Sequence, residues 1–258
     1  MRLQIINIVG FLIMIAINVS ANIIPINGVT QADISDAYPN LFTPTGFTFS
    51  IWGVIYLMLF AFCIYQGRDL FKAENIEMPF IHKIGWLFFI SSILNATWIF
   101  AWHYMQIPLS MLIMVLLLLS LIGIYLRLGI GQTPTTSQKN YWVRIPFRLY
   151  LGWITVATIA NAVILSKHLN WSLLGLTETC WTIILIGAAA IITVSFLKFR
   201  EDLVFSLVVL WALFGIVFER LTAEPVIMPV VIAAIAAMIG IAGYGAVVLT
   251  HRSMEDEV

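Results

Sequence analysis

The chain has 258 residues, of which 61% are hydrophobic and only 10% are charged, and its mean hydropathy is +1.00. A water-soluble domain of this length needs a polar exterior, so this composition excludes a soluble globular protein and indicates an integral membrane protein. The 13 basic residues balance the 13 acidic residues, so the chain has no positive field that could hold a nucleic acid.

Apolar stretches recur along the whole chain, and each approaches the roughly 20 residues that a helix needs to cross the hydrocarbon layer. Continuous apolar runs, unlike alternating patterns, favour helices. The expected spans are residues 3–20, 47–66, 82–103, 107–127, 146–166, 172–196, 202–219 and 225–249. We therefore predict an all-α polytopic membrane protein with about eight transmembrane helices.

The first stretch could instead be a cleaved signal peptide, because Arg2 precedes it and small residues follow it. Asn7 and Asn18 interrupt the apolar run, which favours a retained first helix.

Basic residues predict the orientation of the chain. With the N-terminus in the cytoplasm, only Lys167 and Arg220 of the 13 basic residues fall on the outer side. Omitting or adding one helix would break this alternation. Both ends of the chain are therefore expected in the cytoplasm, with the membrane most simply a bacterial plasma membrane.

The longest outer connection, residues 21–46, contains no Lys or Arg and is rich in Pro, Asn, Thr and Gly. We expect an ordered cap over the outer face, and a flexible linker is the alternative.

Aromatic and amide side chains share faces on three of the expected spans, because residues three or four apart lie on one side of a helix. The candidates are Phe49, Trp52 and Tyr56 on the second span, Asn95, Trp98 and Trp102 on the third, and Trp153, Ala157 and Asn161 on the fifth. Aromatic walls, two amides and a small-residue gap predict a pocket for a flat apolar ligand with a few polar atoms.

These residues also have simpler interpretations. Tryptophans are enriched at membrane interfaces, which accounts for Trp86, Trp142 and Trp171 and could account for Trp52 and Trp98. The two amides could form hydrogen bonds between helices instead of contacting a ligand.

Glu178 lies well inside the sixth expected span, where a carboxylate is costly and usually functional. It is therefore a candidate proton or polar site. A water-filled vestibule or a local pairing with Thr177 or Thr179 would explain it equally.

Catalytic and metal-binding patterns are not found in the sequence, which has no nucleophile–base pair, phosphate loop, dinucleotide fingerprint or metal-ligand spacing. We therefore expect no enzyme and no certain cofactor. Cys63 and Cys180 both fall in apolar segments and are interpreted as packed thiols. Small residues on the last span, Ala233, Ala236, Ala237 and Gly240, offer a close-packing face for a neighbouring helix or a homodimer.

Three segments carry a resemblance to a known family. They are residues 41–56, LFTPTGFTFSIWGVIY, residues 94–100, LNATWIF, and residues 150–161, YLGWITVATIAN. In this order they resemble the TspO/MBR family, the tryptophan-rich sensory or translocator-protein-like proteins, over residues 1–167. The chain departs from that pattern at Pro44-Thr45, where the family has two prolines, and at Phe42 and Phe47, where it has tryptophans.

The resemblance implies a five-helix bundle with a pocket beneath the first long loop. It also implies a porphyrin, haem-type or other aromatic ligand. The positions that match the motifs are Trp52, Asn95, Trp98, Trp153, Ala157 and Asn161. Residues 1–167 would form this ligand-binding bundle, and residues 168–258 would add three transmembrane helices.

The expected function is a membrane receptor or carrier for a small aromatic or tetrapyrrole-like ligand, with a sensory or regulatory role. The main alternative is a proton-coupled transporter that uses Glu178. An enzyme acting on a bound pigment and a purely structural protein are further alternatives. The expected partners are the lipid bilayer, a hydrophobic small molecule and a second copy of the chain, with no nucleic acid.

Overall fold

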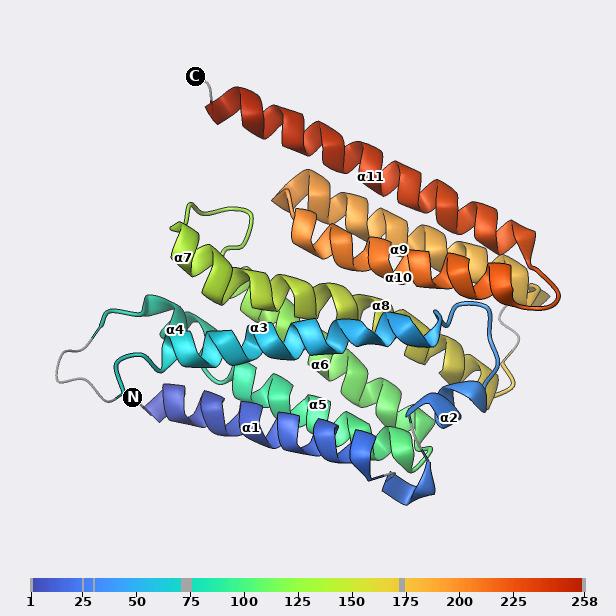
Figure 1. The fold of residues 1–258 in the computed structure, drawn as a ribbon, viewed down its shortest axis with the longest axis horizontal. Coiled ribbons are helices and arrows are strands. Elements are labelled where there is room, and N and C mark those ends of the chain that lie inside the picture. The colour runs from blue at the N-terminus through green and yellow to red at the C-terminus, as the bar shows by residue number, and fades with distance from the viewer. Residues whose placement is uncertain (1, 25, 30, 71–75, 172–174, 257–258) are drawn as a thin grey trace.

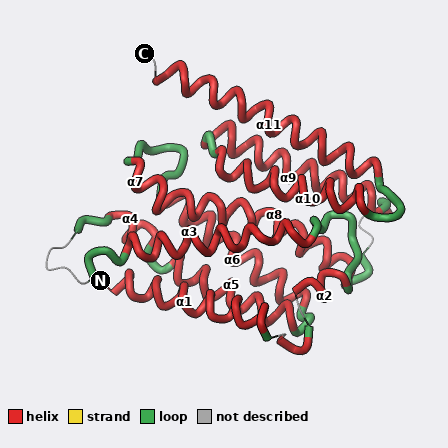
Figure 2. Tube along the Cα trace, in the orientation of Figure 1, coloured by secondary structure: helices red, strands yellow, loops and turns green. Residues whose placement is uncertain are grey.

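The computed structural model describes residues 2–24, 26–29, 31–70, 76–171 and 175–256, which fold almost entirely into helices (Figures 1 and 2). The long helices are α1 (Arg2–Ile23), α3 (Ile51–Gln66), α5 (Leu87–His103), α6 (Ile107–Arg127), α8 (Ile145–His168), α9 (Glu178–Arg200), α10 (Leu203–Thr222) and α11 (Met228–Asp256). The short ones are η1 (Ile26–Gly28), α2 (Gln31–Asp36), η2 (Gly46–Ser50), α4 (Pro79–Ile84), α7 (Ser137–Lys139) and η3 (Asn140–Arg144).

The helices confirm the predicted all-α membrane architecture. Within the described residues, seven helical stretches are long and apolar enough to cross a bilayer, and α5 is a shorter apolar helix. The third span was predicted as one helix over 82–103, but Gly85 adopts φ +58° and separates α4 from α5. Glycine takes this left-handed conformation without steric cost, so it can end α4 and redirect the chain.

The sixth span was predicted to begin at residue 172, which was wrong. Thr177 caps α9 by accepting the Cys180 N–H on its side-chain oxygen, so the helix starts at Glu178. Residues 172–174 lie outside the described part of the chain.

The helices lie in two groups, which Figure 1 shows one above the other. Helices α1, α3, α5, α6 and α8 form a bundle, and α9, α10 and α11 form a layer beside it that contacts the bundle mainly through α10 and α8. A Cβ on Gly152 of α8 would lie only 3.0 Å from Val208 Cβ of α10, so a glycine permits this close approach. Both ends of the described chain lie at the same end of the molecule, as an even number of crossings requires.

Large apolar side chains cover the outer faces of the helices. Leu57, Leu112, Ile191 and Ile239 are all more than half exposed, although they belong to four different helices. Such surfaces are stable against lipid tails and unfavourable in water, so the surroundings of this protein are a bilayer.

Asp202 connects three helices through its buried carboxylate. Arg148 Nε of α8 donates to Asp202 Oδ1 at 2.7 Å, and the Tyr125 hydroxyl of α6 donates to Asp202 Oδ2 at 2.8 Å. The Phe205 N–H donates to Oδ1 at 2.9 Å, so Asp202 also caps α10. Arg148 and Asp202 lie in the predicted spans 146–166 and 202–219, and their pairing was not predicted from the sequence.

The two cysteines differ in their surroundings, and both are free thiols. Cys63 is buried in α3, as expected, whereas Cys180 is exposed in the first turn of α9, so its interpretation as a packed thiol was wrong.

Only part of the small-residue face of α11 is exposed, since Ala237 packs against the core. Ala236 is exposed, and a Cβ on Gly240 would meet nothing within 4 Å. The homodimer therefore stays a prediction.

Candidate ligand-binding cavity

In the connection after α1, residues 38–46 form an ordered cap, as expected. Asn40 organises it, because its Oδ1 accepts the N–H groups of Phe42 and Thr43 at 3.0 and 2.9 Å. Its Nδ2 donates to the Tyr38 carbonyl at 3.0 Å. An asparagine side chain that satisfies neighbouring backbone groups in this way stabilises a turn without a helix or a sheet.

Helix α10 holds the end of this cap in place. The Trp211 indole N–H donates to the Thr48 carbonyl at 2.9 Å, and the Thr45 N–H donates to the Gly215 carbonyl at 3.3 Å. Phe47 packs edge-on against Trp211 and Phe218, with ring centroids 5.6 and 5.3 Å away. Helix α10 of the layer formed by the last three helices thus binds residues 45–48, which lie directly before α3.

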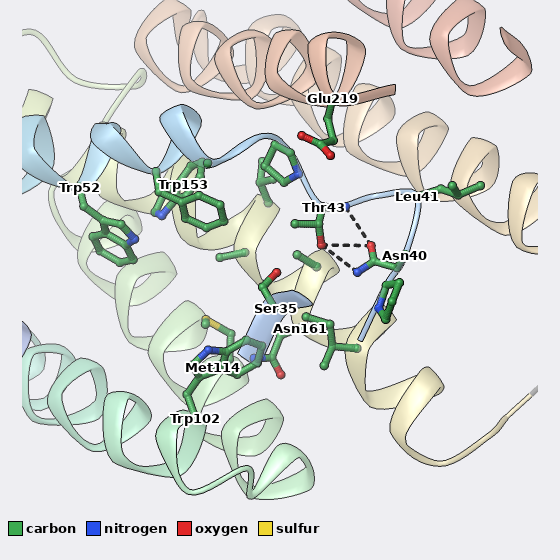
Figure 3. Close-up of a pocket in the computed structure, with 18 of the residues that line it drawn as sticks. Ser35, Asn40, Leu41, Thr43, Trp52, Trp102, Met114, Trp153, Asn161 and Glu219 are labelled. Carbon is green, nitrogen blue, oxygen red and sulfur yellow. Dashed lines mark hydrogen bonds between the residues drawn. The ribbon is translucent and has the colours of Figure 1, made fainter. Parts of the chain in front are cut away.

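A cavity of about 630 Å³ lies beneath the cap. Its volume lies within the range of small-molecule sites in proteins. Figure 3 shows Trp52, Trp102 and Trp153 on one side of this space and the cap residues Asn40 and Thr43 on the other. The predicted site residues that line it are Phe49, Trp52, Trp98, Trp153, Ala157, Asn161 and Glu178.

Aromatic rings form the wall of the cavity in fixed mutual orientations. Trp153 stands edge-on to both Trp52 and Phe49, with centroid distances of 6.2 and 5.8 Å. Trp98 and Trp102 stack at 5.2 Å with an interplanar angle of 23°. Such pairs are mutually stabilising, so they present a rigid apolar surface to a flat ligand.

Tyr56 and Asn95, which were also predicted as ligand-binding residues, do not line the cavity. They belong to a chain of hydrogen bonds beside it. The Tyr56 hydroxyl donates to Asn18 Oδ1 at 2.7 Å, and Asn18 Nδ2 donates to Asn95 Oδ1 at 2.8 Å. Asn95 Nδ2 then donates to the Tyr150 hydroxyl at 2.9 Å. These bonds join α1, α3, α5 and α8, so the Asn95 amide takes the interhelical role that was the alternative interpretation.

Tyr56 and Tyr150 nevertheless support the cavity wall. Trp52 stacks on Tyr56 at 5.2 Å and meets Tyr150 edge-on at 6.0 Å. The hydrogen bonds therefore fix the Tyr56 ring on which Trp52 stacks, although Tyr56 itself does not line the cavity.

Three lining groups keep a polar nitrogen without a partner among the described residues. They are the indole Nε1 atoms of Trp98 and Trp153 and the amide Nδ2 of Asn161, and all three atoms are buried. Ser110 Oγ lies 3.3 Å from Asn161 Oδ1, which leaves the nitrogen end of that amide for another acceptor. Buried donors are normally paired, so these groups are suited to meet acceptors on a ligand.

Glu178 lines the cavity from the start of a helix. It is the first residue of α9, its side chain is 39% exposed, and Lys167 Nζ lies 2.7 Å from its Oε2. Its Oε1 accepts the Leu41 N–H at 3.2 Å, which ties the cap to α9. The predicted position of this carboxylate inside a helix was wrong, because α9 begins at Glu178 and the predicted span began at residue 172.

Two charged lining residues were missed by the sequence reasoning, Glu219 and Arg220 in the last turn of α10. Arg220 Nη2 lies 3.2 Å from Glu219 Oε1. An acidic and a basic residue side by side at the end of an apolar span were the available signal. Arg220 was instead counted only as an outer basic residue.

An iron-containing tetrapyrrole would find few axial ligands here. The described residues that line the cavity include no histidine, cysteine or tyrosine, and Met114 carries their only thioether. His103 is buried with its Nδ1 on the Ile99 carbonyl at 2.7 Å and does not line the cavity. These residues fit an apolar ring system better than an iron ligated by the protein.

The fold and this cavity define a polytopic α-helical membrane protein with a tryptophan-walled cavity near one end of its helices. The family model described as TSPO-like protein matches residues 4–246, and the chain belongs to that family. The match continues through α9, α10 and most of α11, beyond the segment 1–167 that carried the resemblance. The chain matches no curated protein and no solved structure at a significant level.

Proposed function

We propose that this membrane protein is a receptor or carrier for a small aromatic or tetrapyrrole-like ligand, in a sensory or regulatory role. The observation that carries the proposal is the cavity of about 630 Å³, whose wall contains four tryptophans and Phe49. A flat apolar ligand would stack on these rings, and the N–H groups of Trp98, Trp153 and Asn161 would bind its polar edge.

Tryptophan fluorescence is the direct test, because a porphyrin bound between these rings would quench them. The full chain in detergent is titrated with protoporphyrin IX, with haem and with an apolar aromatic hydrocarbon. Saturable quenching is expected, and Trp98→Phe and Asn161→Ala should both weaken it. Trp86→Phe is a matched control, because Trp86 is exposed away from the cavity. The proposal would be rejected if the quenching did not saturate, or if the affinity were the same in the wild type and in both cavity variants.

Proton-coupled transport through Glu178 is the second candidate function. Glu178 lines the cavity and binds the cap, which favours a role in ligand entry. Its exposure and its pairing with Lys167 remove the argument from an uncompensated intramembrane carboxylate. Uptake or efflux in proteoliposomes that depends on a pH gradient and disappears in Glu178→Gln would favour transport over binding alone.

We also propose the topology and organisation expected from the basic residues. Both ends would lie in the cytoplasm, in a bacterial plasma membrane, with residues 1–167 as the ligand-binding bundle and 168–258 as an additional layer. Reporter fusions at each end test the orientation, since an outward signal at either end contradicts it. Crosslinking of a cysteine placed at Gly240 tests the homodimer.

A further inference from the structure

Arg220 is the cation that lies in the wall of the cavity, among the residues that the structure describes there. It stands in the last turn of α10, where only 12% of its side chain is exposed. Its Nε is buried and has no acceptor among the residues that the structure describes. A guanidinium can only donate hydrogen bonds, and leaving one of its N–H groups buried and unpaired is costly.

Its neighbour Glu219 is a poor partner for it. Consecutive residues of a helix do not face each other, and the pair meets through a single nitrogen at 3.2 Å. The Glu219 side chain is 36% exposed, so water competes for its carboxylate. The guanidinium of Arg220 therefore keeps N–H donors in its plane available for a second anion.

The other acidic residue of the lining does not compete for Arg220. Glu178 is compensated by Lys167 at 2.7 Å and by the Leu41 N–H at 3.2 Å. The buried lining nitrogens that have no partner among the described residues, Trp98 Nε1, Trp153 Nε1 and Asn161 Nδ2, can only donate hydrogen bonds. Besides the paired Glu178 and the partly exposed Glu219, the cavity presents one cation and several unpaired N–H groups, and these favour a ligand that carries hydrogen-bond acceptors.

From this arrangement we propose that the cavity binds its ligand as a carboxylate, with Arg220 of α10 as the anion-binding residue. The inference rests on the proposed function and specifies its ligand class, an aromatic acid rather than a neutral aromatic. The ring system stacks on the tryptophans of the bundle, and the acid group reaches the layer formed by the last three helices. This assigns α10 a part in ligand selection.

Protoporphyrin IX and its dimethyl ester form a suitable pair of probes, because they share one ring system and differ in the charge of their carboxyl groups. Both are titrated against the full chain in detergent by tryptophan quenching. The wild type should bind the acid about tenfold or more tightly than the ester, as expected for hydrogen bonds to a charged group. Arg220→Gln should abolish this preference, while the ester still binds saturably.

Two further variants separate the charge of Arg220 from its packing. Arg220→Lys keeps the charge but loses the planar fork, so it should retain part of the preference. Glu219→Gln removes a competing negative charge, so it should strengthen binding of the acid and not of the ester. Arg127→Gln, an exposed arginine of α6 outside the cavity, changes the net charge equally and should behave as the wild type.

The outcomes distinguish this inference from the function on which it rests. Saturable binding of both probes with equal affinity, or a preference that survives Arg220→Gln, overturns the carboxylate site and leaves the receptor function standing. Binding of neither probe overturns both. If Arg220→Gln does not fold, Arg220→Lys decides, because an unchanged preference for the acid in that variant contradicts a bidentate arginine contact.

Discussion

Arg148 of α8 donates through Nε to Asp202 Oδ1 at 2.7 Å, and this ion pair closes the contact between the helix bundle and the layer beside it. The Asp202 side chain is fully buried, and that of Arg148 is 11% exposed. A buried pair of this kind is retained because either charge alone would be costly, and it restricts how α8 and α10 can dock.

Asp202→Asn should therefore destabilise the protein by about 3–5 kcal/mol, because it leaves Arg148 without its counter-charge. Thermal unfolding in detergent measures the loss. The double variant Arg148→Met with Asp202→Leu should recover part of it, since both charges are then removed together. An Asp202→Asn protein with the same unfolding temperature as the wild type would show that the ion pair does not stabilise the contact between the bundle and the layer.

Gly215→Ala should displace the cap from α10. The added Cβ would collide with Thr48 Oγ1 and lie 2.9 Å from Pro44 Cβ. Overpacking of this size costs about 1–3 kcal/mol and should also weaken ligand binding. Both effects are measured by unfolding and by porphyrin titration of the same preparation.

Two comparisons give the Gly215 result its meaning. Gly240→Ala is the control, because nothing lies within 4 Å of its Cβ, and it should not change stability or affinity. Thr48→Ala in the Gly215→Ala background removes the colliding hydroxyl, which has no hydrogen-bond partner in the described part of the chain, and should restore part of both properties. Equal effects of Gly215→Ala and Gly240→Ala would contradict the contact.

Asn95→Leu should reduce stability more directly than ligand affinity. It breaks the bonds to Asn18 and to the Tyr150 hydroxyl, at a cost of about 1–2 kcal/mol. Asn161→Ala should reduce ligand affinity more than stability, since Asn161 lines the cavity. Thr97→Val, an exposed change on the same helix, is the stability control. If Asn95→Leu lost affinity at unchanged stability, Asn95 would act as a ligand contact after all.

Glu178→Gln should cost less than about 1 kcal/mol in stability, because its ion pair with Lys167 is partly exposed to solvent. The substitution weakens the carboxylate bond to the Leu41 N–H, so the cap should open more readily. Stopped-flow quenching should then show faster ligand association and dissociation. Rates equal to those of the wild type would exclude Glu178 as a latch on the cap.

Helical spacing in the sequence predicted much of the cavity wall. Trp153, Ala157 and Asn161 repeat at four-residue intervals, so one face of α8 had to present them together, and all three line the cavity. Spacing could not distinguish Asn95 from Asn161, because both are amides on apolar helices at similar depths. Only the position of Asn18 and Tyr150 makes Asn95 a structural residue.

Helix ends were less predictable than helix faces. Glu178 was placed inside a span because the residues before it are apolar, whereas the Thr177 cap starts α9 at Glu178 itself. Hydropathy averages over a window and does not register one capping hydrogen bond.

The membrane location and the number of apolar crossings follow from the sequence, because the bilayer imposes one length and one polarity on every spanning helix. The faces of α3, α5 and α8 follow from helical periodicity. Contacts between segments distant in the chain depend on which side chains fit together. Arg148 pairs with Asp202, and α10 adds Arg220 to a cavity wall built mainly by the bundle. The glycines of α8 and α10 permit this arrangement, because they let α10 pack closely against α8 and against the cap.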